Sequence, residues 1–175
     1  MDPDLLQRLR GRDMSALADL VRLHGPAIAR AAYLFLHDGH AADDMAQETM
    51  VAAWDAAPRT TVKTSLRPWL FGILLNRCRK YQRSLWRRLR RERRAGSAGR
   101  PDAAADEQEQ DRLTRLRRAL AGLDEDLRAV VILRYEQGLT VAETGRALGV
   151  PEGTVKSRAH TALQRLRQVM RCDGG

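Results

Sequence analysis

The apolar residues of this chain recur at intervals of three and four along almost its whole length. One face of an α-helix repeats every 3.6 residues, whereas a half-buried β-strand alternates with a period of two. No stretch of the sequence alternates like a strand for long. The pattern therefore predicts an all-α protein and leaves the division into domains to be decided by composition.

The clearest break in composition is the stretch RRERRAGSAGRPDAAADEQEQD, residues 90–111. It runs from an arginine cluster through Gly, Ser and Pro to acidic residues, and it has no large apolar side chain, which is typical of a linker. We therefore predict two small helical domains, 1–92 and 111–175, joined by a flexible linker at 93–110. The second domain is small enough that docking on a partner would contribute to its stability.

The formal net charge of +9 indicates an anionic partner. Nucleic acid is the commonest one, although basic ribosomal and membrane-surface proteins have a similar composition. No apolar run approaches the length of a membrane span, and the start MDPDLLQRL lacks the features of a signal peptide. Cys78 and Cys172 match no metal or redox spacing. We expect a cytoplasmic protein without membrane insertion, metal or cofactor.

The C-terminal domain contains the pattern of a helix-turn-helix motif at residues 140–160. Thr140 and Glu143 form a capping box, which predicts the start of a short helix. Gly149 suits a left-handed stop of that helix, and Pro151 suits the first turn of the next one. Two helices joined by so tight a turn are the motif that places its second helix in the major groove of DNA.

The second helix of this motif has a polar face that can bond base edges and phosphates. That face comprises Thr154, Lys156, Ser157, Arg158, His160 and Thr161. The alternative interpretation is a helical hairpin whose basic face is only solvated. A lone exposed histidine is usually a surface residue, but His160 shares its face with Lys156 and Ser157, which favours a DNA contact.

In the N-terminal domain, the stretch AADDMAQETMVAAW predicts a helix with one acidic face. The outward residues are Asp43, Asp44, Gln47 and Glu48, with Val51 in their midst and with Met50 and Trp54 at the edge. Apolar side chains within a ring of charge are typical of a protein docking site. A metal site is the alternative, but nothing else in the sequence supplies ligands to complete it.

The next predicted helix, from about residue 66 to 91, has an apolar face and an opposite basic face. The basic face comprises Asn76, Arg79, Lys80, Arg83, Arg87, Arg90 and Arg91. So long a basic stripe, with almost no compensating acid, repels itself unless it meets an anion, which favours nucleic acid over a solvated surface. Membrane-surface binding is the competing interpretation.

The loop before this helix lies between Trp54 and Trp69 and carries hydroxyl and basic side chains. Such a loop could hold an unstacked base. Its candidate DNA-binding residues are Arg59, Thr61, Lys63, Thr64 and Ser65.

Taken in this order, the segments resemble the bacterial sigma-70 family, and specifically its small extracytoplasmic-function branch. AADDMAQETMVAAW is similar to region 2.2 of that family, and TSLRPWLFGILLNRCRKYQR is similar to regions 2.3 and 2.4. The stretch that begins LDEDLRAVVILRY and includes GVPEGTVKSR resembles region 4. The linker is too short for the region 3 domain of larger family members.

The resemblance implies a sigma factor that binds core RNA polymerase and directs promoter-specific transcription initiation. The acidic face would meet the clamp of the largest polymerase subunit, and the first helices of the C-terminal domain would pack on the polymerase flap. The 59–65 loop with Asn76, Arg79, Lys80 and Arg83 would bind the −10 element of promoter DNA. The 154–161 face would bind the −35 element, and an anti-sigma factor would be the regulatory partner.

Two other functions fit parts of the sequence. A lone helix-turn-helix regulator would bind operators as a dimer without core polymerase. A DNA recombinase with a similar C-terminal reader would be an enzyme, but Ser65 and Ser84, its conceivable nucleophiles, have no cluster of acids, bases and arginines around them. We therefore expect no catalytic activity.

Overall fold

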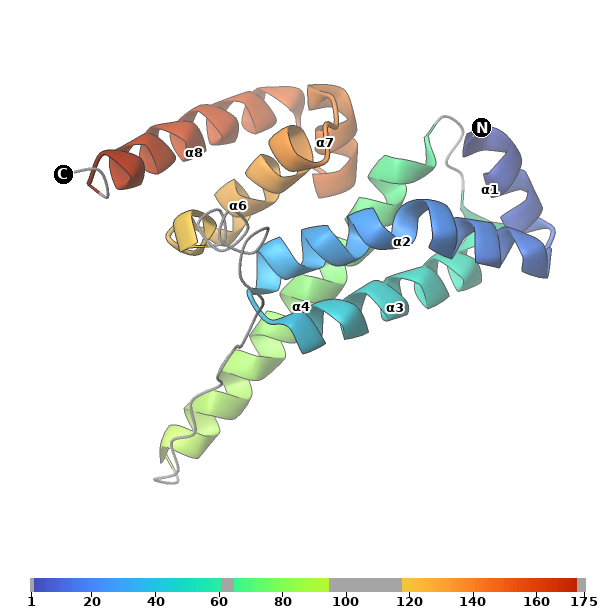
Figure 1. Ribbon diagram of the computed structural model, residues 1–175, viewed down its shortest axis with the longest axis horizontal. Coiled ribbons are helices and arrows are strands. Elements are labelled where there is room, and N and C mark those ends of the chain that lie inside the picture. Colours follow the sequence, from blue (N-terminus) through green and yellow to red (C-terminus); the bar gives the residue numbers. More distant parts are fainter. Residues whose placement is uncertain (1, 61–64, 95–117, 173–175) are drawn as a thin grey trace.

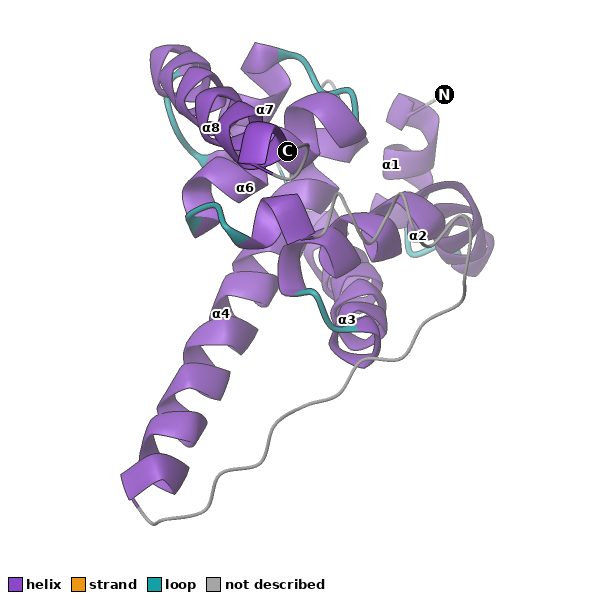
Figure 2. Cartoon of the chain, turned by 60° about the vertical axis from the view of Figure 1, so that its left-hand side comes forward, coloured by secondary structure: helices purple, strands orange, loops and turns teal. Residues whose placement is uncertain are grey.

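The computed structural model describes residues 2–60, 65–94 and 118–172, and within these ranges it contains helices and no strand. The prediction of an all-α protein is confirmed. Figure 1 shows the helices in sequence colours, and Figure 2 shows them after a turn of the molecule.

The N-terminal unit is built on two long antiparallel helices with a third lying across them (Figure 1). Its elements are α1 (Asp2–Arg10), α2 (Met14–Leu36), α3 (Gly39–Ala56), the short 3-10 turn η1 (Ala57–Arg59) and α4 (Leu66–Arg94). Local signals set the ends of the pair. Asp13 and Asp38 cap α2 and α3 by accepting backbone N–H bonds of 2.9 and 3.0 Å, and His37 ends α2 with φ of 62°.

The C-terminal unit begins with a helical turn at 118–121 and then follows the predicted pattern. Its elements are α6 (Glu125–Val131), the π-helical turn η2 (Ile132–Glu136), α7 (Val141–Leu148) and α8 (Glu152–Cys172). The capping box between Thr140 and Glu143 is present, and Gly149 ends α7 with φ of +67°. Pro151 directly precedes α8 instead of occupying its first turn. The helix-turn-helix prediction is therefore confirmed.

The two units share one hydrophobic core. Leu120, Leu123, Leu133 and Leu139 of the C-terminal unit belong to the same buried cluster as Phe35 of α2. Helix α7 packs on α4, while α6 and η2 pack on α2. The stabilising partner expected for the small C-terminal domain thus lies within the chain itself. The domain boundaries stay predictions, and α4 runs two residues into the segment predicted as linker.

Arg128 joins the two units from inside this core. It is only 9% exposed, and its guanidinium donates to the carbonyls of Leu120 and Leu123 at 3.0 Å and to that of Phe35 at 2.8 Å. The guanidinium also lies 5.8 Å from the centre of the Phe35 ring. Burial lowers the pKa of Arg128, but an arginine remains charged in proteins. Backbone carbonyls of both units therefore replace water around a permanent charge.

The contact surface between the two units, called the seam from here on, also depends on a close approach between α4 and α7. A Cβ on Gly72 would lie 3.1 Å from the carbonyl oxygen of Ala147. At the rim, Arg67 donates to the carbonyl of Gln137 at 2.9 Å, and Arg30 pairs with Glu136. The contact between the units thus combines apolar packing at its centre with arginine bonds around it.

Replacing Gly72 with leucine is expected to separate the two units. Its side chain would strike the α7 backbone, and overpacking of this kind costs about 1–3 kcal/mol. We expect a larger radius of gyration by small-angle X-ray scattering, with helix content by circular dichroism unchanged. Gly153→Leu is the matched control, because a Cβ there meets no atom within 4 Å. An unchanged radius for Gly72→Leu would contradict the close approach.

Candidate functional site

The acidic face of α3 points to solvent as predicted. Asp43, Asp44, Gln47 and Glu48 are exposed, while the inward residues Ala42, Met45, Ala46, Thr49 and Ala53 are buried. The Thr49 hydroxyl donates to the carbonyl of Met45 at 2.6 Å, which satisfies the one polar group on the inward side. The helix therefore presents its carboxylates on a firmly packed base.

Apolar side chains interrupt this acidic face in the predicted manner, with one correction. Val51 is 60% exposed and lies among the carboxylates of this face. Trp54 is half-buried, and the guanidinium of Arg12 lies 5.2 Å from the centre of its ring. Met50 was predicted at the edge of the face but is buried in the core. The exposed apolar part of the face is thus Val51 with one side of Trp54.

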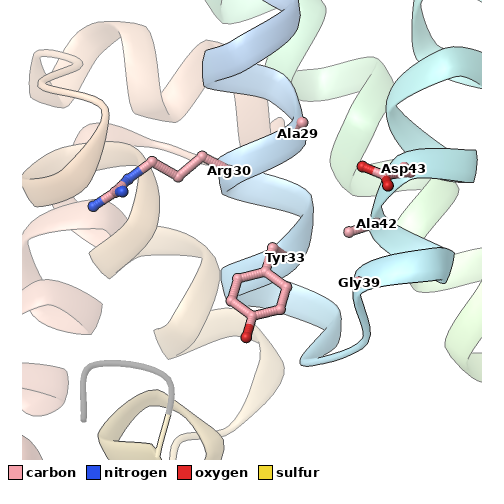
Figure 3. A pocket seen from close by; sticks show the side chains of 6 residues that line it. All are labelled: Ala29, Arg30, Tyr33, Gly39, Ala42 and Asp43. Carbon is pink, nitrogen blue, oxygen red and sulfur yellow. The ribbon is translucent and has the colours of Figure 1, made fainter. Parts of the chain in front are cut away.

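A groove between α2 and α3 continues the acidic face. Figure 3 shows Asp43 projecting from α3 toward α2, beside the small residues Ala29, Gly39 and Ala42. Arg30 also lines the groove but points toward the C-terminal unit, where it pairs with Glu136. Within the described ranges neither Asp43 nor Asp44 has an ion-pair partner, whereas Glu48 pairs with Arg77 of α4. Two free carboxylates are therefore available to a partner.

The basic face of α4 is only partly free. Asn76, Lys80 and Arg83 are exposed. Arg79 instead crosses the seam, where its Nε lies 2.8 Å from an oxygen of Glu125 and its Nη2 lies 2.9 Å from an oxygen of Asp126. This contact was missed from the sequence, since no local pattern links α4 to the start of α6.

The loop before α4 is described only at its ends. Arg59 is exposed in η1, and Ser65 is half-buried. Thr61, Lys63 and Thr64 lie outside the described residues. Arg10 donates to the carbonyl of Thr60 at 2.8 Å, which fixes where the loop leaves the body.

The helix-turn-helix exposes most of its predicted reading face. Lys156, Ser157 and His160 are exposed, and Thr154 and Thr161 are half-buried. Val155 and Ala162 are fully buried on the opposite side of α8. A Cβ on Gly145 would lie 2.8 Å from the carbonyl of Val150, so only glycine allows α7 to meet this turn. The turn therefore fixes the angle at which α8 presents its polar side chains.

One carboxylate connects the two basic faces. Arg158 of α8 pairs with Asp126, the same residue that holds Arg79 of α4. The pairs are half-exposed, with the side chains of Arg79 and Arg158 at 21% and 26% and that of Asp126 at 49%. Two of the predicted DNA-binding arginines are thus bound to an acid of the chain itself.

Other chemistry finds little support in the described residues. They contain no group of three or more His, Cys, Asp or Glu side chains placed to hold a metal ion. Burial raises the pKa of the Cys78 thiol to about 12, so this cysteine is protonated at neutral pH. Among the described helices, none combines the length and the apolar character of a membrane span.

Comparison with known proteins matches both units to one family. Residues 20–88 match the model for Sigma-70 region 2, and residues 119–168 match that for Sigma-70, region 4. The chain is 33% identical over 172 residues to the ECF RNA polymerase sigma factor SigM of Mycobacterium tuberculosis, covering 97% of this chain and 84% of SigM. It is 26% identical to the ECF RNA polymerase sigma factor SigW of Bacillus subtilis, covering 95% of each.

Solved structures agree with these sequence matches. The structure of CnrH in complex with the cytosolic domain of CnrY has a TM-score of 0.79 and 27% identity, covering 99% of both chains. The sigma factor RpoE from Bartonella quintana, solved with the anti-sigma factor NepR, has a TM-score of 0.72 and 26% identity, covering 89% of this chain and 97% of RpoE. This chain therefore belongs to the sigma-70 family of RNA polymerase sigma factors, within its ECF branch.

Proposed function

We propose that this sigma factor directs promoter-specific transcription initiation through three separate faces and catalyses no reaction itself. The acidic face of α3 binds the clamp of the largest subunit of core RNA polymerase. The basic face of α4, with the 59–65 loop, binds the −10 element. The polar face of α8 binds the −35 element. The observation that carries this assignment is the exposed Val51 within a ring of carboxylates, because it marks a face built for a protein partner.

Docking on polymerase combines charge and apolar contact. Asp43 and Asp44 are free to pair with basic residues, and Val51 and Trp54 supply the apolar centre of the contact. Interfaces of this type depend on a few buried apolar residues, while the surrounding charges select the partner and speed association. Glu48 contributes less, since Arg77 already neutralises it.

Promoter reading is divided between α4 and α8. Asn76, Lys80 and Arg83 reach DNA directly, whereas Arg79 must first leave Glu125 and Asp126. Capture of a flipped base by the loop compensates the unstacking cost of about a few kcal/mol that strand opening requires. On α8, each good base contact contributes about 1–3 kcal/mol, and phosphate contacts by Thr154 and Arg158 add a salt-dependent part.

The linker between the two DNA-binding units makes their binding to the promoter cooperative. The predicted linker at 93–110 makes the second DNA contact an intramolecular event. Two units that each bind their promoter element weakly can therefore give a usable specificity together. The first helices of the C-terminal unit meet the polymerase flap in this assignment. They pack on α2 in the free protein, so polymerase binding requires the seam to open.

An anti-sigma factor is the proposed regulatory partner. Two structures similar to this chain over most of its length are complexes, namely CnrH with the cytosolic domain of CnrY and the sigma factor RpoE with the anti-sigma factor NepR. A partner that covers the acidic and basic faces together would block polymerase and promoter binding at once. We place this regulation in the cytoplasm.

The docking assignment predicts that Asp44→Arg with Gln47→Arg abolishes binding to core RNA polymerase. The two substitutions cancel the negative charge of the face and spare Glu48, which has a structural pair. Binding is measured by co-purification with core enzyme, and folding by circular dichroism. Asp4→Arg with Gln7→Arg is the matched control, since these exposed residues have the same types and spacing on α1. Retained binding by the α3 variant would remove the assignment.

The −35 assignment predicts that Lys156→Ala reduces promoter discrimination. Loss of one base contact is expected to lower the affinity ratio between a cognate and a scrambled −35 element by a factor that corresponds to about 1–3 kcal/mol of binding free energy. The ratio is measured with purified holoenzyme on the two duplexes. Gln168→Ala, also on an exposed position of α8, serves as control. The role of Lys156 fails if both variants discriminate as well as wild type.

The shared carboxylate predicts that Glu125→Gln with Asp126→Asn improves DNA binding by the free protein. Half-exposed ion pairs contribute about 0.2–1 kcal/mol each, and Arg79 makes two of them, so releasing Arg79 should raise affinity for a single-stranded −10 oligonucleotide about two- to thirtyfold. Fluorescence anisotropy at fixed salt measures the change. Asp4→Asn with Glu152→Gln is the matched control, because it removes the same charge from exposed positions elsewhere in the chain. Equal gains in both variants would show a general charge effect and no specific hold on Arg79.

A further inference from the structure

The first helix, α1, carries none of the three proposed binding faces. It precedes residues 20–88, the part of the chain that matches region 2. Figure 1 shows it at the end of the bundle where α2 begins and α3 ends. Leu5, Leu6 and Leu9 are 5% exposed or less and belong to the common core. A helix of nine residues is too short to be stable alone, so this apolar packing fixes where α1 lies.

Arg8 fixes the orientation of α1 relative to α2. Its Nε lies 3.0 Å from a carboxylate oxygen of Asp13, and its Nη1 lies 3.0 Å from one of Asp19. Its Nη2 donates to the hydroxyl of Ser15 at 2.7 Å. Hydrogen bonds from Ser15 and Arg8 lower the pKa of Asp13 to about 2, so this carboxyl is charged at neutral pH. The end of α1 is therefore held by charge-assisted bonds as well as by its leucines.

Arg12, in the turn after α1, joins this helix to the proposed docking face. Its Nη1 donates to the carbonyl of Trp54 at 3.3 Å and lies 3.8 Å from a carboxylate oxygen of Asp55. The same guanidinium lies over the Trp54 ring. Arg12 has φ of 59°, a left-handed conformation that is uncommon for a residue other than glycine. The turn after α1 and the end of α3 are thus connected through one side chain.

Arg10, in the last turn of α1, reaches the other side of η1. Its Nη2 donates to the carbonyl of Thr60 at 2.8 Å. Thr60 is the last residue described before the gap at 61–64, and its own N–H reaches the carbonyl of Ala57 at 3.3 Å. A carbonyl lies in the plane of the peptide that follows it. The bond from Arg10 therefore sets the direction in which the chain continues into the 59–65 loop.

This bond constrains the loop more than it constrains the helix. Helix α1 is already fixed by its three buried leucines and by Arg8. The dipole of α1 favours a cation in its last turn, but it does not select the carbonyl of Thr60 as the partner of that cation. Ordering a loop residue costs conformational entropy, and the cost falls on ligand binding unless the free protein has already met it. A bond to Thr60 that exists before DNA arrives lowers the cost of ordering the loop around a base.

We propose that Arg10 is a positioning residue for the −10 element: from α1 it holds Thr60, and it thereby presents the 59–65 loop to an unpaired base. The inference rests on the proposed function, in which this loop captures a flipped base. Arg10 acts through Thr60 and does not itself read the DNA. Because Arg12 connects the same helix to Trp54, α1 also keeps the start of the loop at a fixed position relative to the docking face.

The test compares Arg10→Met with the wild type in holoenzyme, by fluorescence anisotropy on single-stranded oligonucleotides. They carry the non-template −10 strand of a promoter that the holoenzyme transcribes, either intact or with one abasic nucleotide at successive positions. The position at which an abasic nucleotide weakens wild-type binding most identifies the captured base. Methionine keeps an unbranched side chain and removes the donor to Thr60. Loss of one hydrogen bond should lower affinity for the intact oligonucleotide about two- to tenfold. Affinity for the oligonucleotide that lacks the captured base should fall by a smaller factor, because the two changes act on one contact.

Arg22→Met is the matched control, since it removes the same charge from α2, where Arg22 pairs with Asp19 of its own helix. It should leave both affinities unchanged, and both variants should co-purify with core polymerase like the wild type. If Arg10→Met weakens the intact and the abasic oligonucleotide by the same factor, or weakens neither, the positioning role is overturned while base capture stands. If no abasic position weakens wild-type binding, base capture by the loop is itself refuted, and the −10 assignment of the loop fails together with the inference.

Discussion

Arg128 places a permanent charge inside the seam between the two helical units, and the rest of the arrangement depends on how that charge is satisfied. A buried guanidinium without partners would cost several kcal/mol, so its carbonyl acceptors must stay in place. Leu120 and Leu123 supply acceptors from its own unit, and Phe35 supplies one from α2. Arg128 therefore orders the start of the C-terminal unit and fixes that unit against the N-terminal unit with the same side chain.

The seam and the promoter faces use the same chemistry. Arg30, Arg67 and Arg79 of the N-terminal unit all donate to acceptors of the C-terminal unit. A carboxylate and a phosphate offer a guanidinium similar charge-assisted bonds. In the proposed function, acceptors of the chain and of DNA therefore compete for Arg79, and Asp126 holds Arg158 in the same way. If both side chains bind DNA as proposed, closing the seam and binding a promoter are mutually exclusive for them.

Local patterns predicted the fold and the exposure of most candidate site residues, because the responsible forces act within a few residues. The capping box at Thr140, the left-handed Gly149 and the outward carboxylates of α3 all follow from sequence spacing. The seam could not be predicted in this way. Arg128 and Phe35 are 93 residues apart, and nothing near either residue identifies the other. Helix periodicity also could not predict whether Met50 is buried, since Met50 lies at the boundary between the acidic face and the core-facing side of α3.

Helix α4 links the contact with α7, the ion pairs with α6 and the exposed basic face, because all three lie at successive positions along this one straight helix. Gly72 meets α7 near its start, Arg79 bridges to α6 in its middle, and Arg83 is exposed one turn further along. Each residue advances the helix by about 1.5 Å, so these levels keep fixed distances from one another. If the seam opens at Gly72, the helix does not need to bend to free Arg79, so the proposed −10 face would become continuous in a single movement of the C-terminal unit.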